Sequence, residues 1–219
     1  YVRLPLRLGE DSFKDGLISD IKIETLSNAL LSFKYIMKVH NVTDYQIYAT
    51  SALRESINSK DVIDRIKKST GLKINIITGL KEAKIISIGN PLSKLEINKT
   101  NLYIDVGGGS TEYSILRKGV NKKSKSFKMG TVRLLNNKTD TLVINEIKNW
   151  LISNIELNEK VKLYASGGNI NKIQSMSGSK SGKPISYLSI KNLYNTLVNY
   201  EYNERIARFD LSPDRADVI

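Results

Sequence analysis

The stretch Tyr103–Tyr113, YIDVGGGSTEY, decides how this sequence is interpreted. An apolar run ends at Asp105, three glycines follow, and a second run opens at Ser110. A tight hairpin turn needs only one or two glycines, so this loop has more than a turn requires. Consecutive glycines let successive N–H groups point into one concavity, where a phosphate can approach the backbone closely. We therefore predict a phosphate-binding loop, with a plain glycine-rich hairpin as the alternative, formed by Gly107, Gly108, Gly109, Ser110 and Thr111.

Two carboxylates flank the loop. Asp105 ends the first strand at the mouth of the loop, and Glu112 lies on the return strand. A carboxylate beside a bound phosphate requires a divalent cation between the two negative groups, and Mg²⁺ takes oxygen ligands of this kind. We therefore predict a site for Mg²⁺, or another divalent cation, at Asp105 and Glu112.

The composition indicates a globular protein that attracts anions. Of the 219 residues, 40% are hydrophobic and 26% are charged, and the formal net charge is +12. Such a charge attracts nucleic acid, anionic lipid, polyphosphate or nucleotide, although a lysine-rich genome produces the same excess. The basic runs lack interleaved aromatic residues, so we do not expect nucleic-acid binding.

Two features of the sequence bear on location. No apolar run approaches the ~20 residues that a membrane helix needs, so we expect no membrane span. The chain has no cysteine, which excludes disulfides and thiolate metal sites and fits a reducing compartment. We therefore expect a cytoplasmic protein.

Hydrophobic periodicity predicts strands and helices in both halves of the chain. Helices are expected to begin at Ser19 and Ser189, each serine acting as the N-cap, and to cover 61–70, 81–89, about 144–155 and a short stretch after Gly167. The predicted strands are 2–8, 45–50, 73–78, 101–106, 111–117, 123–129 and 161–166.

This pattern divides the chain into two lobes. We predict a first lobe at 1–89, a polar linker containing a proline at 90–101, and a second lobe at 102–219. Each lobe combines strands with helices, and the second opens with an antiparallel meander whose lysine-rich last strand is expected at the sheet edge. The expected architecture is therefore two α/β lobes with a cleft between them.

Three further motifs occur in order around IDVGGGSTE: ATSALRE at 49–55, TGLKEAKIISIG at 78–89 and MGTVRLL at 129–135. With these motifs the chain resembles the exopolyphosphatase/guanosine pentaphosphate phosphohydrolase (Ppx/GppA) family over essentially its whole length. The resemblance implies a two-lobed actin-like ATPase (ribonuclease H-like) fold with the active site between the lobes. It also implies Mg²⁺-dependent hydrolysis that releases the terminal phosphate of inorganic polyphosphate.

The resemblance assigns roles to specific residues. Glu82 matches the family glutamate of the G-x-x-E-A motif, which orients the attacking water, and Arg54 matches its cleft arginine. A guanidinium is well suited to binding phosphate oxygens and to balancing charge in the transition state. Gly167 and Gly168 match a later glycine turn that contacts phosphate, although Asn169 stands where the family usually has a small hydroxyl residue.

A first phosphate loop of the type Asp-x-Gly-Ser-Asn-Ser, expected from the superfold, has no match in residues 1–20. Because Tyr1 is not a natural start, we expect that this loop was lost from the chain rather than from the protein. The end after Ile219 likewise looks truncated.

Several alternatives stay open at this point. The substrate could be guanosine pentaphosphate instead of inorganic polyphosphate, because no guanine pocket can be recognised in the sequence. The chain could also be a non-catalytic sensor of polyphosphate or nucleotide. A homodimer is a candidate assembly for any of these functions. An ATPase or sugar kinase of the same superfold is disfavoured by the motifs around Arg54 and Glu82.

Overall fold

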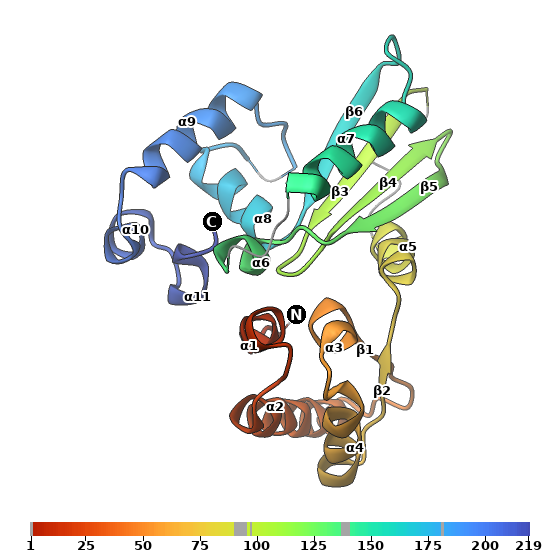
Figure 1. Cartoon of the computed structure of the whole chain (residues 1–219), viewed down its shortest axis with the longest axis vertical. Coiled ribbons are helices and arrows are strands. Elements are labelled where there is room, and N and C mark those ends of the chain that lie inside the picture. The colour runs from red at the N-terminus through yellow and green to blue at the C-terminus, as the bar shows by residue number, and fades with distance from the viewer. Residues whose placement is uncertain (1, 90–95, 97, 137–140, 181) are drawn as a thin grey trace.

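The computed structural model describes residues 2–89, 96, 98–136, 141–180 and 182–219. Its elements form a lower and an upper lobe (Figure 1). The lower lobe contains α1 (Leu8–Asp15), α2 (Asp20–Val39), β1 (Ile47–Ala49), α3 (Ser51–Glu55), α4 (Ser59–Thr70) and β2 (Ile74–Ile76). The upper lobe contains α5 (Gly79–Gly89), β3 (Thr100–Val106), β4 (Thr111–Arg117), β5 (Val120–Phe127), α6 (Thr131–Leu135), α7 (Thr141–Asn154), β6 (Val161–Ser166), α8 (Gly168–Met176), α9 (Tyr187–Val198), α10 (Tyr202–Phe209) and α11 (Pro213–Ala216).

The lower lobe packs α2, α3 and α4 around a short parallel pair, β1 and β2. Ser19 caps α2, as predicted, by accepting a hydrogen bond from the N–H of Lys22. Gly71 ends α4 in the left-handed conformation, with φ at 73°. The hydrophobic core of this lobe consists of Ile18, Ile23, Leu26, Leu30, Ala49, Leu53, Val62, Ile66, Leu72 and Ile74.

The strand predicted at 2–8 is wrong. Residues 2–7 form no regular element, and Leu8 already belongs to α1. A strand needs a hydrogen-bonded neighbour, and within the described residues the lower sheet consists only of β1 and β2. Arg7 instead takes a left-handed conformation, with φ at 50°, and turns the chain into α1.

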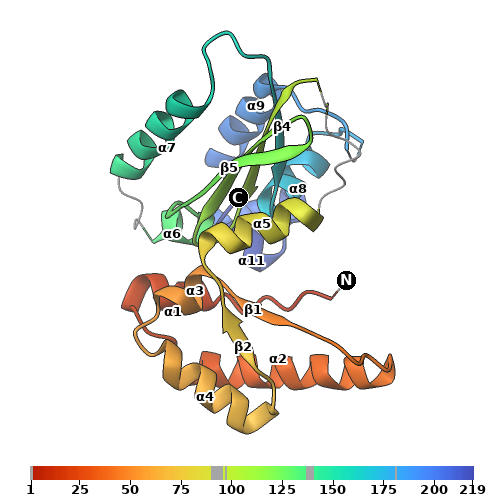
Figure 2. The ribbon, with the colours of Figure 1, turned by 90° about the vertical axis from the view of Figure 1, so that its right-hand side faces the viewer.

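The upper lobe is built on a four-stranded sheet in the order β5-β4-β3-β6. The β3–β4 and β4–β5 pairs are antiparallel and β3–β6 is parallel, so the meander and the edge position of β5 are as predicted. Helix α7 covers one face with the apolar cluster of Leu102, Tyr113, Ile115, Phe127 and Ile147. Helices α5 and α8 lie on the opposite side of the sheet (Figure 2).

The last helices form a separate small cluster around Leu197, Leu211 and Ala216. The predicted N-cap of α9 is wrong, because the helix begins at Tyr187 and Ser186 caps it. The Ser186 hydroxyl accepts a hydrogen bond from the N–H of Ser189 at 3.0 Å. Among the described residues, no helix has both the length and the apolar character that a membrane span requires.

Helix α5 joins the two lobes. It follows β2 of the lower lobe but packs against β4 and β5 of the upper sheet. A Cβ on Gly79 would lie only 2.4 Å from the Cβ of Ser126, so the helix can start this close to β5 only with glycine. The predicted linker at 90–101 falls mostly outside the described residues, and β3 begins at Thr100. The division at residue 89 stays a prediction.

The upper core generates a stability prediction. Ile115 is fully buried between α7 and the sheet, and truncating it leaves a cavity. We expect Ile115→Ala to lower the free energy of unfolding by about 2–5 kcal/mol, measured by urea denaturation. Val120→Ala, at an exposed position of β5, is the control and is expected to change it by less than about 0.5 kcal/mol. Equal effects of the two variants would contradict the assigned core.

Candidate active site

Four polar side chains lie in one row across the upper sheet. The strand register pairs Asp105 with Glu112, Glu112 with Ser126, and Asp105 with Ser166. Because directly paired residues share one face of a sheet, all four lie on the side that α5 covers. The Ser126 hydroxyl donates to Glu112 at 2.6 Å, and the Ser166 hydroxyl donates to Asp105. The two carboxylates are therefore held in fixed positions near the strand ends.

Glu82 and Arg54 approach this row from two different elements. Glu82 lies in the first turn of α5, and Arg54 lies in α3 of the lower lobe. Nη1 of Arg54 lies 3.4 Å from Oε2 of Glu82 and donates to the carbonyl of Ile77 at 2.7 Å. Both predicted catalytic residues are therefore in contact with each other, and both side chains are largely buried.

The electrostatics of the site follow from this crowding. Burial raises the pKa of Glu82 to about 7, with Glu112 and Asp105 adding to the rise and Arg54 opposing it. Burial also raises the pKa of Glu112, against hydrogen bonds from Ser126 and Ser110. A carboxylate that titrates near neutral pH is well matched to accepting a proton from water. The arrangement therefore gives Glu82 the chemistry of a general base.

The glycine loop, residues 107–110, is held from behind by α6. The first three N–H groups of α6 donate to the carbonyls of Gly107 and Gly108 at 3.0, 2.9 and 3.1 Å. The Arg133 side chain donates from Nε to the carbonyl of Gly109 at 2.9 Å. A Cβ on Gly130 would lie 2.4 Å from the backbone of Gly108, so only glycine permits this approach.

These bonds determine where the loop N–H groups point. The peptide bonds of the described residues are trans, and in a trans peptide the carbonyl and the next N–H point in opposite directions. Three consecutive carbonyls held towards α6 therefore direct the N–H groups of Gly108, Gly109 and Ser110 away from it. Among the described residues these N–H groups have no protein acceptor. Such a run of free donors has the geometry of an anion-binding concavity, and binding of phosphate here stays a prediction.

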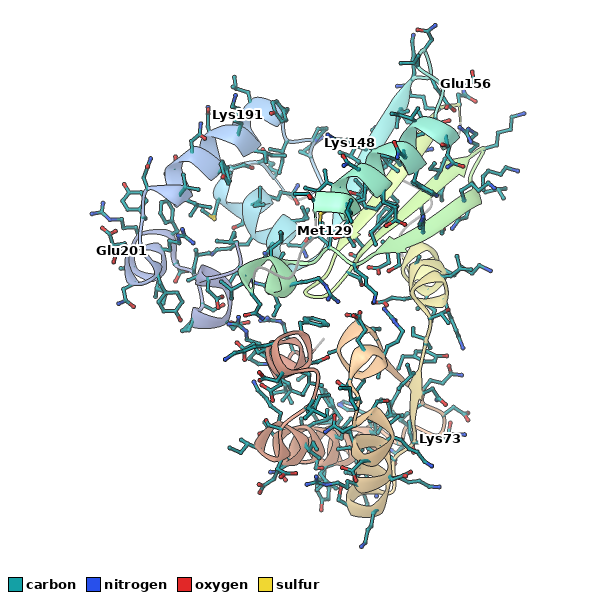
Figure 3. The ribbon with its side chains drawn as sticks, viewed as in Figure 1. Lys73, Met129, Lys148, Glu156, Lys191 and Glu201 are labelled. Carbon is teal, nitrogen blue, oxygen red and sulfur yellow. The ribbon has the colours of Figure 1, made fainter. Side chains whose placement is uncertain are left out.

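The hydroxyl groups of the loop are less available than the N–H groups. Thr111 is buried, and its hydroxyl donates to the carbonyl of Met129, the residue labelled in Figure 3 between β5 and α6. The Ser110 side chain lies beside Glu112 and lowers the pKa of that carboxyl, against the larger effect of burial. Thr111 therefore helps to fix the loop, and direct contact of either side chain with phosphate stays a prediction.

The second glycine turn lies beside the first. Ser166 pairs with Asp105 on parallel strands, so Gly167 and Gly168 leave the sheet at the same edge as the glycine loop. Asn169 is buried there and accepts a hydrogen bond from Arg215 at 2.8 Å. The structure thus brings both glycine turns together, while phosphate binding by Gly167 and Gly168 stays a prediction.

The predicted metal site contains two carboxylates. Within the described residues, no group of three or more His, Cys, Asp or Glu side chains is arranged to hold a metal ion. Mg²⁺ is commonly bound by one or two carboxylates together with water and substrate phosphates, so the paired Asp105 and Glu112 fit that ion. A Mg²⁺ site here would be completed by the substrate.

A surface cavity of about 570 Å³ opens beside these residues. Arg54 and Ser110 line it together, which places the cleft arginine and the end of the glycine loop at one opening. Glu55 and Lys128 also line it, with Nζ of Lys128 3.5 Å from Oε2 of Glu55. An anionic group can therefore reach Arg54 and Ser110 from solvent.

Two residues that the sequence did not predict for the site join the lobes here. Arg133 is buried, and its Nη2 donates to both carboxylate oxygens of Glu55 at 2.9 Å. The two residues are 78 positions apart, so no local pattern pairs them. One feature of the sequence could have indicated a role for Arg133: it is the only charged residue of the short helix TVRLL. That segment was interpreted only through its resemblance to the family.

Comparisons with known proteins identify the family of this chain. A sequence profile of the Ppx/GppA phosphatase family matches residues 3–219. The chain belongs to the Ppx/GppA phosphatase family. A bifunctional 3-dehydroquinate synthase/phosphatase from Fusobacterium nucleatum is 32% identical over 98% of this chain, which covers 36% of that protein. Exopolyphosphatase 1 of Mycobacterium leprae is 28% identical over 50% of the chain and 32% of its own length.

A solved structure supports the same conclusion about the fold. The exopolyphosphatase from Cytophaga hutchinsonii superposes with a TM-score of 0.80 at 24% identity, over 97% of this chain and 75% of that one. The expected two-lobed α/β fold is therefore confirmed. This chain of the Ppx/GppA family spans about a third of the length of the curated relatives above.

The raised pKa of Glu82 generates a prediction about stability. Below the ordinary pKa of 4.5, the Glu82 carboxyl is protonated in both the folded and the unfolded chain. As the pH rises from there towards about 7, the free energy of unfolding falls, because the unfolded chain loses this proton more readily than the folded chain, which would have to bury the charge. Glu82→Gln removes that charge. We expect it to raise the free energy of unfolding by about 1–3 kcal/mol at pH 8 and to leave it nearly unchanged at pH 4.

Urea denaturation at both pH values measures this difference. Glu156→Gln, at an exposed position labelled in Figure 3, is the control. We expect less than about 0.5 kcal/mol from it at either pH. Destabilisation by Glu82→Gln at pH 8 would mean that Glu82 is not a strained buried carboxylate.

Proposed function

We propose that this protein is an exopolyphosphatase that uses Mg²⁺ and water to release the terminal phosphate of inorganic polyphosphate. The observation that carries the proposal is the convergence of a carboxylate with a pKa of about 7, Glu82, and the guanidinium of Arg54 on a loop of free N–H groups. The names of relatives in the Ppx/GppA family support the reaction class. The whole protein's substrate is part of the proposal.

In the proposed reaction, the N–H groups of Gly108, Gly109 and Ser110 bind oxygens of the terminal phosphoryl group. Arg54 donates to the same group and offsets its charge. Glu82 accepts a proton from water as the water oxygen bonds to phosphorus, and the bond from phosphorus to the bridging oxygen breaks. The products are inorganic phosphate and a polyphosphate shorter by one unit. Mg²⁺ bound at Asp105 and Glu112 would neutralise part of the substrate charge.

Arg54 couples substrate binding to the base in this proposal. In the structure it pairs with Glu82 and lowers the pKa of that carboxyl. A phosphate that draws Arg54 towards itself removes this opposing influence. Glu82 then becomes a stronger base at the moment when substrate is present.

Guanosine pentaphosphate is the alternative substrate, and a non-catalytic sensor of polyphosphate or nucleotide is the alternative function. The substrate is tested by competition, because the preferred phosphoanhydride should inhibit release from the other. Binding of polyphosphate without release of phosphate would favour the sensor. A cytoplasmic location and a homodimer stay predictions.

The role of Glu82 is tested by Glu82→Gln in the whole natural protein. We expect kcat for phosphate release from long-chain polyphosphate to fall by roughly 10²–10⁴, the range for a lost general base, while binding of polyphosphate persists. Phosphate release with Mg²⁺ and calorimetric binding measure the two effects. Glu156→Gln is the matched control, and unchanged turnover of Glu82→Gln would exclude this base.

The role of Asp105 is tested by Asp105→Asn. Because the amide is a weaker ligand for Mg²⁺ than the carboxylate, we expect the Mg²⁺ concentration for half-maximal release to rise at least about tenfold, with lower turnover. Asp44→Asn, an exposed aspartate of the lower lobe, is the control. A Mg²⁺ dependence identical to that of the unaltered protein would place the ion elsewhere.

A further inference from the structure

We propose that Arg133 is a positioning residue that clamps α3 of the lower lobe to the glycine loop of the upper lobe. Through this clamp, Arg54 and the loop N–H groups are held facing one phosphate group. The kinetic consequence rests on the proposed function, whereas the structural consequence does not.

The contacts of Arg133 span three segments. Its Nε donates to the carbonyl of Gly109 at 2.9 Å, and its Nη2 donates to both oxygens of Glu55 at 2.9 Å. Its guanidinium carbon lies 4.3 Å from the ring centre of Phe13 in α1. With only 8% of the residue exposed, these contacts are shielded from water, where charged hydrogen bonds are stronger. One side chain thus joins α1, α3 and the glycine loop.

Each end of the clamp adjoins a residue of the proposed reaction. Glu55 directly follows Arg54 in the short helix α3. Holding the Glu55 carboxylate therefore also holds the backbone from which the Arg54 side chain extends. Gly109 directly precedes Ser110, and holding its carbonyl turns the N–H of Ser110 the opposite way. Arg133 therefore fixes the position of Arg54 relative to the N–H of Ser110, the two groups that would bind phosphate. Arg133 itself would not contact the phosphate.

The geometry requires arginine rather than lysine. The planar guanidinium presents several donors in fixed directions and stacks on an aromatic ring, whereas an ammonium is a compact point charge. Only the former can reach a carbonyl and a carboxylate at once while lying over Phe13. Lys128 also lies 3.5 Å from Glu55, so that carboxylate keeps a cation when Arg133 is replaced.

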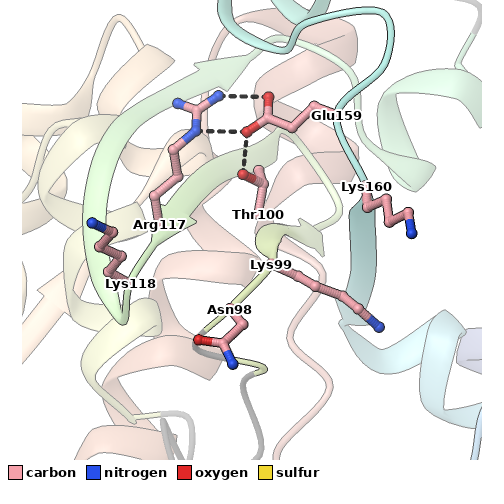
Figure 4. A pocket seen from close by; sticks show the side chains of 7 residues that line it. All are labelled: Asn98, Lys99, Thr100, Arg117, Lys118, Glu159 and Lys160. Carbon is pink, nitrogen blue, oxygen red and sulfur yellow. Dashed lines mark hydrogen bonds and ion pairs between the residues drawn. The ribbon is translucent and has the colours of Figure 1, made fainter.

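The sheet offers a matched control at its far end. Nε and Nη2 of Arg117 donate to the two carboxylate oxygens of Glu159 at 2.8 Å (Figure 4). Like Arg133, Arg117 also donates to a carbonyl, that of Asn154, at 2.8 Å. It ends β4 on the side of the sheet away from the glycine loop. Arg117→Gln therefore removes the same chemistry from a place that the proposed reaction does not use.

The structural test is hydrogen exchange of the ligand-free protein. We expect Arg133→Gln to speed exchange in both 107–111 and 51–55, although these segments belong to different lobes. Arg117→Gln should leave both unchanged. Exchange that rises in neither segment, or in only one, would overturn the clamp whatever the protein hydrolyses.

The kinetic test is a double-mutant cycle on kcat/KM for phosphate release. We expect Arg133→Gln to lower kcat/KM about 10–100-fold, as for a small misplacement of reacting groups, and Arg133→Lys to lower it nearly as much. In the Arg133→Gln background, the fold-decrease in kcat/KM caused by Arg54→Gln should be at least about tenfold smaller than in the unaltered protein. In the Arg117→Gln background, the fold-decrease caused by Arg54→Gln should be the same as in the unaltered protein.

The outcomes separate the two proposals. If the unaltered protein releases no phosphate, the proposed function fails and the exchange result alone decides the clamp. If it does release phosphate, equal costs of Arg54→Gln in all backgrounds would overturn the positioning role. A reduced cost with Arg133→Gln only would support it.

Discussion

The hydrogen bonds from α6 to the carbonyls of the glycine loop are the interaction on which the site depends. Glycines alone would leave this loop free to adopt many conformations. Helix α6 and the side chain of Arg133 select one of them by taking three consecutive carbonyls, and trans peptide geometry then directs three N–H groups together. In the proposed function, these contacts on the side of α6 are what make the loop an anion site. Helix α6 in turn is held to the lower lobe through Glu55.

The same site concentrates groups that oppose stability. Burial raises the pKa of Glu82, and the like charges of Glu112 and Asp105 raise it further. Hydroxyl donors from β5 and β6 and one guanidinium offset part of this cost. A cation would stabilise a negatively charged cluster of this kind, which is consistent with the proposed Mg²⁺ site. Enzymes are often less stable than they could be because their active sites contain such buried, reactive groups.

Sequence patterns predicted much of this fold because most elements obey local rules. The strands of the meander, the Ser19 cap and the Gly71 stop each depend on neighbouring residues and were recovered. The strand at 2–8 failed because alternation alone does not provide a pairing partner. The Ser189 cap failed because Ser186 satisfies the same pattern three residues earlier. Within the site, the register of Asp105, Glu112 and Ser126 and the long-range bond from Arg133 to Glu55 arise only when the chain folds.

The most direct measurement of the central claim is an amide NMR titration of the ¹⁵N-labelled protein with inorganic triphosphate. If α6 directs the loop N–H groups towards a phosphate, the amide signals of Gly108, Gly109 and Ser110 should shift together with one dissociation constant. The amide of Gly119, in the turn after β4 at the other end of the sheet, should stay in place. Shifts confined to the far cavity lined by Lys99, Lys118 and Lys160, with the loop amides unmoved, would contradict the account.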